Sequence, residues 1–279
     1  MEALRLPAPR LVKRTVNSIP LFTDDALYDA SSVRIAFTGR DGGKSKGAYA
    51  SLNLGSHVGD EIEDVLENRS TLLQAIGAEG MPLVVPNQVH GTDIVDIDSA
   101  SAPAVAAAQE QATAGADALA VGAAGVAALL CFADCVPLIV VSPSGRFAVA
   151  HAGWRGAVSR IASKTVRRLC SLDERDLGAN APGPSGYNAY IGPHICARCF
   201  EVGEEVSSRF ASEFGGSCVP DTRHVDLEAA LAADFESVGV PACRVVSAGV
   251  CTKCSPDGFF SYRASGGVCG RHGALAYRS

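Results

Sequence analysis

The sequence has no excess of basic side chains. Of its 279 residues, 24 are Lys or Arg and 30 are Asp or Glu, which gives a net charge of −6. Its single basic stretch, residues 10–14, is short and lies near the N-terminus. Proteins that bind nucleic acid usually present a broad positive surface, and this composition does not supply one. We therefore expect no nucleic-acid partner.

Long apolar runs are also missing. No stretch approaches the roughly 20 apolar residues that cross a bilayer. The first residues, MEALRLPAPRLVKR, lack the apolar core of a secretion signal. We therefore expect no membrane contact and a cytoplasmic location, where the ten cysteines would be free thiols. The sequence does not indicate an oligomeric state.

Three familiar catalytic motifs are absent or incomplete. The chain has no His-Glu-x-x-His, and it has no His-x-Glu followed by Pro-Cys-x-x-Cys, the pattern of zinc nucleobase deaminases. Gly43-Lys44-Ser45 resembles the end of a phosphate-binding loop, but the required first glycine is replaced by Thr38. Any catalytic site must therefore be assembled by the fold from residues that are distant in the sequence.

The apolar pattern predicts many short strands with helices between them, which is typical of a layered α+β domain. Residues 1–30 are predicted to be a loosely held lead-in, and residues 31–279 a single domain. The stretch 171–188, rich in Gly, Pro and Asn, is the only candidate for an internal boundary. Residues 38–60 are predicted to form a long functional loop, and residues 99–115 an exposed excursion. Helices are expected from Asp60 to Ile76, after Gly156, within GPHICARCFEVGEEV, and from an Asp226 cap.

The central stretch runs from Cys131 to Gly156 and predicts a β-hairpin. Apolar runs at Pro137–Val141 and Phe147–Ala150 flank a Pro-Ser-Gly turn. Cys135 precedes the first run and His151 follows the second, so an antiparallel hairpin brings the thiol and the imidazole together. His90 ends another apolar segment and is also followed by Gly.

These residues leave two kinds of chemistry open. His90, Cys135 and His151 together offer three ligands, the usual number in a catalytic zinc site. Cys135 and His151 alone offer a nucleophile with its base. A zinc-stabilised binding module without catalytic activity is a third reading. Two further Cys-x-x-Cys pairs, Cys196/Cys199 and Cys251/Cys254, are compatible with a four-thiolate zinc site, but we favour free thiols there.

Seven motifs, in this order, resemble the laccase-domain family, also called the polyphenol oxidase or YfiH-like family. They span residues 33–265 and read FTGRDGG…YASLNLGSHVGD, NQVHGTD, ADALA, CFADCVPL, VAHAGWRG, GPHI…CFEVGEEV and CTKC…FFSYR. The resemblance implies a four-layer α/β/β/α sandwich with mixed sheets. It also implies a zinc ion held by His90, Cys135 and His151. Arg263 is followed by Ala-Ser-Gly-Gly, where the family often has a second Arg and an Asp.

The family's members include enzymes named purine nucleoside phosphorylase and peptidoglycan editing factor. The resemblance therefore implies phosphorolysis of adenosine, inosine or methylthioadenosine, with adenosine deamination alongside, and nucleoside and phosphate as small-molecule partners. Under this hypothesis Cys135 and His151 are also catalytic residues. Arg40 and Arg155 are candidates for binding phosphate, and Asn53 and Gln88 for binding ribose or base.

Two alternative functions stay open at this point. One is a Cys135–His151 hydrolase or amidase that acts on cell-wall precursors by thiolate attack. The other is a copper-dependent polyphenol oxidase, as the family's older name suggests. Copper is the less favoured metal, because six histidines are few for a multicopper cluster in addition to a blue-copper site.

Overall fold

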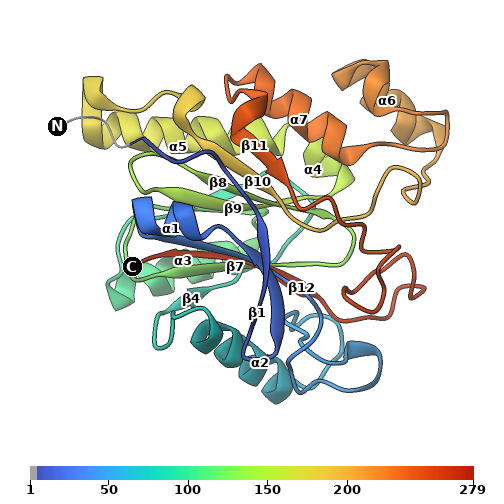
Figure 1. Ribbon diagram of the computed structural model, residues 1–279, viewed down its shortest axis with the longest axis horizontal. Helices are drawn as coiled ribbons and strands as arrows, with labels where there is room; N and C mark the ends of the chain where they lie inside the picture. Colours follow the sequence, from blue (N-terminus) through green and yellow to red (C-terminus); the bar gives the residue numbers. More distant parts are fainter. Residues whose placement is uncertain (1–4) are drawn as a thin grey trace.

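A computed structural model describes residues 5–279 of the chain. Within those residues, two six-stranded sheets lie face to face and helices cover their outer sides (Figure 1). The four-layer α/β/β/α sandwich and the α+β class predicted from the sequence are confirmed.

The first sheet is built from both ends of the described chain. Its order is β1 (Val12–Val16), β2 (Ile19–Thr23), β3 (Val33–Thr38), β12 (His272–Arg278), β7 (Ala127–Phe132) and β4 (Leu83–Val84). β12 lies in the middle and pairs antiparallel with both β3 and β7. Closing this sheet therefore depends on a segment that is distant in sequence from most of its neighbours.

The second sheet carries the predicted hairpin. Its order is β11 (Val245–Ser247), β10 (Asn188–Ile191), β8 (Val136–Val141), β9 (Phe147–Ala152), β6 (Ala118–Val121) and β5 (Ile94–Ile97). Every residue of β6, β8, β9 and β10 is buried. One face of these strands packs on the other sheet and the opposite face packs on helices, so their sequences are apolar except at His151 and Asn188.

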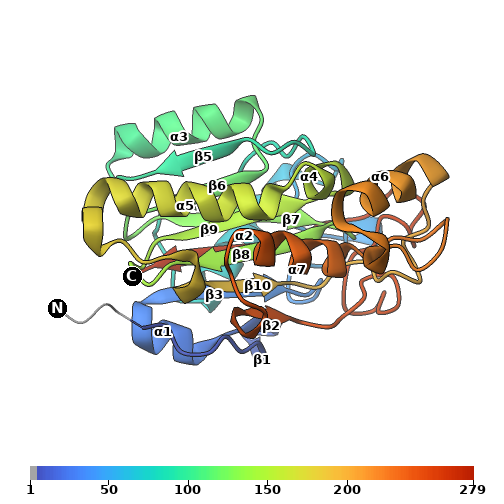
Figure 2. The same cartoon turned by 90° about the horizontal axis from the view of Figure 1, so that it is seen from above.

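The helices divide between the two outer faces and the edges of the sandwich. They are α1 (Asp25–Ser31), α2 (Ile62–Ala75), α3 (Ala102–Ala114), α4 (Trp154–Val158), α5 (Ile161–Leu177), α6 (Glu204–Phe214) and α7 (Leu227–Ser237). Helices α4 to α7 lie over the second sheet, and α2 lies under the first (Figures 1 and 2). The core between the sheets is formed by side chains of both, including Phe37, Phe132 and Tyr190.

Three expectations about local structure are wrong. Described residues before position 31 form β1, β2 and α1 instead of a loose lead-in, because Ile19, Leu21 and Leu27 are buried. The stretch 99–115 contains α3, which buries Ala108 and Ala112. The candidate boundary at 171–188 is largely helix α5 followed by short helical turns, so it does not separate two domains.

Two predicted helix starts also need correction. α2 begins after Glu61, and the predicted cap Asp60 instead accepts hydrogen bonds from Ser45 and Asn53. The helix expected within GPHICARCFEVGEEV starts only at Glu204, because the preceding cysteine pair forms a turn. The Asp226 cap is confirmed, since its side chain accepts the N–H of Ala229 at the start of α7.

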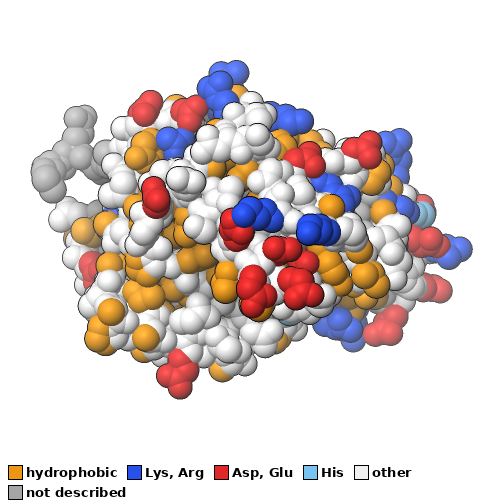
Figure 3. Space-filling model, turned by 90° about the horizontal axis from the view of Figure 1, so that it is seen from below, with side chains coloured by type: hydrophobic (Ala, Val, Ile, Leu, Met, Phe, Trp, Pro, Cys, Tyr) orange, Lys and Arg blue, Asp and Glu red, His pale blue; other side chains and the backbone are white. Residues whose placement is uncertain are grey.

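The charge distribution is mixed on the face seen from the α2 side. Acidic side chains gather near the centre of that face, with Lys and Arg scattered around them (Figure 3). The acidic residues in the first turn of α2 stabilise that helix, because the N-terminal end of a helix carries partial positive charge.

Across the described residues, none of the helices combines the length and the apolar content needed to span a bilayer.

Candidate metal centre

Three side chains from separate elements converge at one end of the second sheet. His90 lies in the loop between β4 and β5, Cys135 immediately precedes β8, and His151 lies in β9. One ligand atom from each lies within 4.8 Å of those of the other two. Cys135 Sγ is 3.9 Å from His90 Nε2. The structure thus brings together the three residues that the sequence predicted would meet.

The hairpin register explains how Cys135 and His151 approach each other. β8 and β9 pair antiparallel, with Val136 opposite Ala152 and Pro137 opposite His151. Strand β9 extends one residue beyond His151, so the histidine lies inside the strand and not after it as predicted. Gly153 follows directly, and a Cβ on it would lie only 2.6 Å from His90 Cδ2. A glycine is therefore required for the two histidines to share this space.

Asp117 holds both histidines in place. Its carboxylate accepts the backbone N–H groups of Val89, His90 and Gly91, at 3.3, 3.0 and 2.6 Å. Its Oδ1 lies 2.7 Å from Nδ1 of His151, and its carbonyl accepts the N–H of His151. His90 adopts a left-handed backbone conformation, with φ of +61°, which these hydrogen bonds stabilise.

The electrostatics of the three groups favour a thiolate. Burial would raise the pKa of the Cys135 thiol, but the charge and hydrogen bonds of His151, together with His90, lower it to about 6. For His151, burial opposes the charged form, while Cys135 and the hydrogen bond that Asp117 accepts raise its pKa to about 9. Asp117 itself is buried, yet its bonds to His151 and to backbone N–H groups keep its pKa low. A thiolate is the form of cysteine that binds metals.

This donor set fits a metal ion. Two imidazoles and one thiolate are three ligands, and catalytic zinc typically has three protein ligands. Asp117 occupies Nδ1 of His151, which leaves Nε2 for an ion. A carboxylate behind a ligating histidine is the usual support that fixes its tautomer and orientation. His90 is exposed while His151 is only 3% exposed, so the group lies at the wall of a cavity and not in the core.

The cavity beside this group has a volume of about 420 Å³. The three candidate ligands, with Phe132, Asp134 and Gln88, form part of its wall, and the rest comes from segments near residues 57, 195–200 and 262–271. Two arginines, Arg263 and Arg271, face this space. In the described chain each makes side-chain hydrogen bonds through Nη1 alone, so further N–H groups remain for a ligand.

Only one of the four predicted substrate residues lines this cavity. Gln88 does, although both ends of its amide pair with the backbone of Cys131. Asn53 is fully buried and binds Asp60, Gly55 and the N–H of Arg271. Its position therefore supports the loop, and we correct its predicted role in binding ribose or base.

The two predicted phosphate-binding arginines also lie outside the cavity lining. Arg40 donates to the carbonyls of Ala50 and Pro256 and stacks over Phe260. Arg155 is exposed on α4 and lies over the ring of Trp154. The arginines that line the cavity are instead Arg263 and Arg271. Both lie in or near the motif FFSYR and the loop that follows it, and that context was the available signal.

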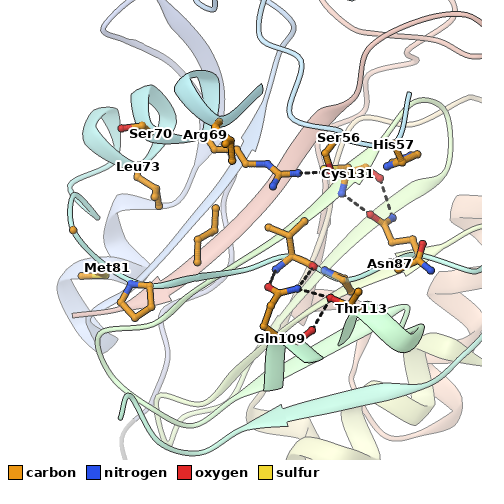
Figure 4. Close-up of a pocket in the computed structure, with 17 residues that line it drawn as sticks. Ser56, His57, Arg69, Ser70, Leu73, Met81, Asn87, Gln109, Thr113 and Cys131 are labelled. Atoms are coloured by element: carbon orange, nitrogen blue, oxygen red, sulfur yellow. Dashed lines mark hydrogen bonds between the residues drawn. The ribbon is translucent and has the colours of Figure 1, made fainter. Parts of the chain in front are cut away.

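A larger cavity of about 750 Å³ adjoins the first one, and the two share His57, Gln88 and Cys131. Figure 4 shows His57, Cys131 and Asn87 at one end of it, while Leu73 and Met81 lie toward the other. Gln109 closes one side by bonding the backbone of Val85 at both its N–H and its carbonyl. The lining of this larger space lacks the three converging candidate ligands, which line the smaller cavity.

Comparison with known proteins gives one family. The family model described as "Multi-copper polyphenol oxidoreductase laccase" matches residues 34–279. The chain is 37% identical over 241 residues to adenosine deaminase RL5 from an unknown prokaryotic organism, covering 84% of this chain and 89% of that protein. It is 36% identical over 245 residues to a purine nucleoside phosphorylase of Deinococcus radiodurans, covering 86% and 87%.

A solved structure is similar over almost the full length. The crystal structure of YlmD from Geobacillus stearothermophilus superposes with a TM-score of 0.80 and 31% sequence identity, and the match covers 99% of both chains. The resemblance inferred from the seven motifs is thereby confirmed.

Proposed function

Since the chain belongs to the multi-copper polyphenol oxidoreductase laccase family, whose relatives include proteins named for nucleoside chemistry, we propose that it is a zinc-dependent purine nucleoside phosphorylase. Its substrates would be a purine nucleoside, such as adenosine, inosine or methylthioadenosine, and inorganic phosphate. One observation carries the proposal: His90, Cys135 and His151 converge at the wall of a cavity that also contains two arginines.

The chain's own residues suit the requirements of phosphorolysis. Phosphate needs charge-assisted donors, and Arg263 and Arg271 have N–H groups available at the cavity. The base needs an apolar surface, which Phe132, Phe200 and Tyr262 supply. Zinc held by the three ligands would act as a Lewis acid toward an oxygen of the substrate or of water. Asp117 would keep His151 oriented and its Nδ1 engaged throughout.

Adenosine deamination is a second candidate activity at the same site. The relative named adenosine deaminase RL5 is 37% identical to this chain, which is similar to the identity of the phosphorylase of Deinococcus radiodurans. Both reactions need the same purine pocket, so one cavity suits either. We propose deamination as an accompanying activity.

The family model's name makes copper oxidation an alternative. Among residues 5–279, the groups of three or more clustered ligands are His90–Cys135–His151 and a set of four cysteines. A multicopper oxidase needs several histidines around further ions, and neither His194 nor His272 belongs to a clustered group. The group of His90, Cys135 and His151 therefore favours a single zinc ion in the cavity. The Cys135–His151 hydrolase is also less favoured, because zinc ligation would occupy the thiolate that it needs.

Incubation of the purified protein with adenosine, with and without phosphate, tests the proposal. We expect ribose 1-phosphate and adenine only when phosphate is present. Inosine formed in either sample would indicate deamination, and free ribose would indicate a hydrolase and contradict phosphorolysis. Replacing His151 by Ala should lower the zinc content of the same preparation by one ion per chain and abolish base release. Full phosphorolysis by metal-free protein would refute the zinc role.

A further inference from the structure

Four cysteines from two segments meet at a second place beside the cavity. Cys196 and Cys199 lie in the turn before α6, and Cys251 and Cys254 lie in the segment after β11. The four Sγ atoms all lie within 4.8 Å of one another. The sequence analysis favoured free thiols here, because each pair lies in a stretch with its own apolar pattern.

A short backbone pairing brings the two segments side by side. His194 and Cys251 form an isolated parallel bridge. The N–H of His194 bonds the carbonyl of Val250 at 3.1 Å, and the N–H of Thr252 bonds the carbonyl of His194 at 3.0 Å. The first Cys-x-x-Cys then turns back on itself, because Cys199 donates its N–H to the carbonyl of Cys196 at 2.9 Å. Its two thiols therefore lie toward those of the other pair.

The spacing of the sulfur atoms suits one tetrahedral ion. With zinc–sulfur bonds of about 2.3 Å, the edges of an S₄ tetrahedron are about 3.8 Å long. Cys199 Sγ and Cys254 Sγ are 3.4 Å apart, and the other pairs lie within the 4.8 Å limit. The N–H of Cys196 points at Cys251 Sγ at 3.3 Å, a donor of the kind that stabilises a metal-bound thiolate.

We propose that Cys196, Cys199, Cys251 and Cys254 form a second metal centre, a structural zinc site with four thiolate ligands. Four protein ligands close the coordination sphere, so this ion would have no position for substrate. Its role would be to fix the two segments against each other. The site formed by His90, Cys135 and His151 is separate and has different ligands.

The two segments joined by this ion form one wall of the cavity. Phe200 directly follows Cys199, and Tyr262 and Arg263 follow Cys254 by eight and nine residues. Arg263 donates to the carbonyl of Glu201 at 3.0 Å, which ties the segments together again. Asp134 binds the hydroxyl of Thr252 and the N–H of Arg263, so the same wall is anchored next to Cys135.

Zinc content measured on matched variants tests the proposal. The protein is expressed with zinc in the medium, purified with reductant and without chelator, and analysed by elemental mass spectrometry. We expect Cys254→Ser to contain one zinc fewer per chain than the wild type. Cys243→Ser is the control, because Cys243 is an exposed free thiol outside both groups, and it should keep the wild-type content.

A His90→Ala variant separates this site from the cavity site. Cys254→Ser should remove one zinc per chain both in the wild-type background and in His90→Ala. This loss then does not depend on whether the cavity holds an ion. Cobalt substitution gives a second readout. The intense thiolate-to-cobalt charge-transfer bands of a four-thiolate site should persist in His90→Ala and disappear in Cys254→Ser.

Titration of the His90→Ala variant with an organomercurial gives a further readout and should release one zinc from the four-thiolate site. Equal zinc content in Cys254→Ser and Cys243→Ser would overturn the proposal. So would an intact mass, measured without reductant, that is lower by the hydrogens of two disulfides.

Discussion

The carboxylate of Asp117 lies 2.7 Å from Nδ1 of His151, and the same carboxylate accepts the N–H groups of Val89, His90 and Gly91. One side chain therefore orients one candidate ligand and fixes the loop that carries another. Neither histidine could keep its present position if this carboxylate were lost.

Replacing Asp117 by Asn should weaken zinc binding 10- to 100-fold, roughly the effect of losing the partner of a ligating histidine. The amide would offer an N–H where Nδ1 of His151 already carries a proton, which favours the wrong tautomer. Competition with a chromogenic chelator measures the change. Asp98→Asn is the control, because Asp98 makes only surface ion pairs with Arg146 and Arg175. Equal zinc affinity in the two variants would contradict the role of Asp117.

Replacing Arg271 by Gln should raise the KM for phosphate roughly 10- to 100-fold, since a charge-assisted hydrogen bond is worth about 1.5–3 kcal/mol. The KM for the nucleoside should change less. Steady-state kinetics with varied phosphate measures this effect. Arg155→Gln is the matched control, because Arg155 lies over Trp154 outside the cavity lining. If Arg155→Gln raised this KM and Arg271→Gln did not, the assignment of the cavity arginines would be wrong.

Replacing Asn53 by Ala should reduce stability and leave zinc content unchanged. The buried amide satisfies Asp60, both backbone groups of Gly55 and the N–H of Arg271. Its loss should cost roughly 2–4 kcal/mol in the free energy of unfolding. Urea denaturation measures this cost. Asn87→Ala, at an exposed position, should stay within about 0.5 kcal/mol of the wild type. Similar values for the two variants would count against the supporting role of Asn53.

His272 should make the protein less stable in acid. It is fully buried, and neither ring nitrogen has a hydrogen-bond partner among the described residues. Burial, followed by the charge of Arg271, lowers its pKa from 6.5 to about 3. Below pH 6.5 His272 is therefore protonated in the unfolded chain but stays neutral in the folded protein. The free energy of unfolding falls as the pH falls.

Replacing His272 by Phe should remove about 2 kcal/mol of the stability difference between pH 8 and pH 5. Urea denaturation at the two pH values measures it. Phe259→Leu alters the packing beside the same ring, whose centroid is 5.5 Å from that of Phe259, and should lower stability equally at both pH values. An unchanged pH dependence in His272→Phe would show that this histidine is not the cause.

The sequence predicted best what depends on neighbours in the chain. The hairpin of β8 and β9 follows from two apolar runs and one turn, and its register determines that Cys135 meets His151. His90 was singled out because it ends an apolar segment and precedes Gly, and the motif NQVHGTD then supported it. Asp117 lies in the motif ADALA but was not identified as a site residue, because its partners are 26 to 34 residues away.

Two of the failures share one physical cause, which is that distant segments return to the same place. Arg271 reaches the cavity because β12 is inserted beside β7. The two cysteine pairs meet through the bridge between His194 and Cys251. The strand β1 was missed because Lys13, Arg14 and Thr15 are all exposed, so its sequence lacks the alternation of a half-buried strand.

The central position of β12 also affects how the chain folds during synthesis. Strands β3 and β7 leave the ribosome long before residues 272–278, and each then has an unpaired edge that β12 later occupies. Unpaired edges of apolar strands are templates for aggregation. In the nascent protein these two edges of the first sheet therefore stay unpaired until β12 is synthesised. The yield in cells should depend on chaperones that shield β3 and β7 until translation reaches β12.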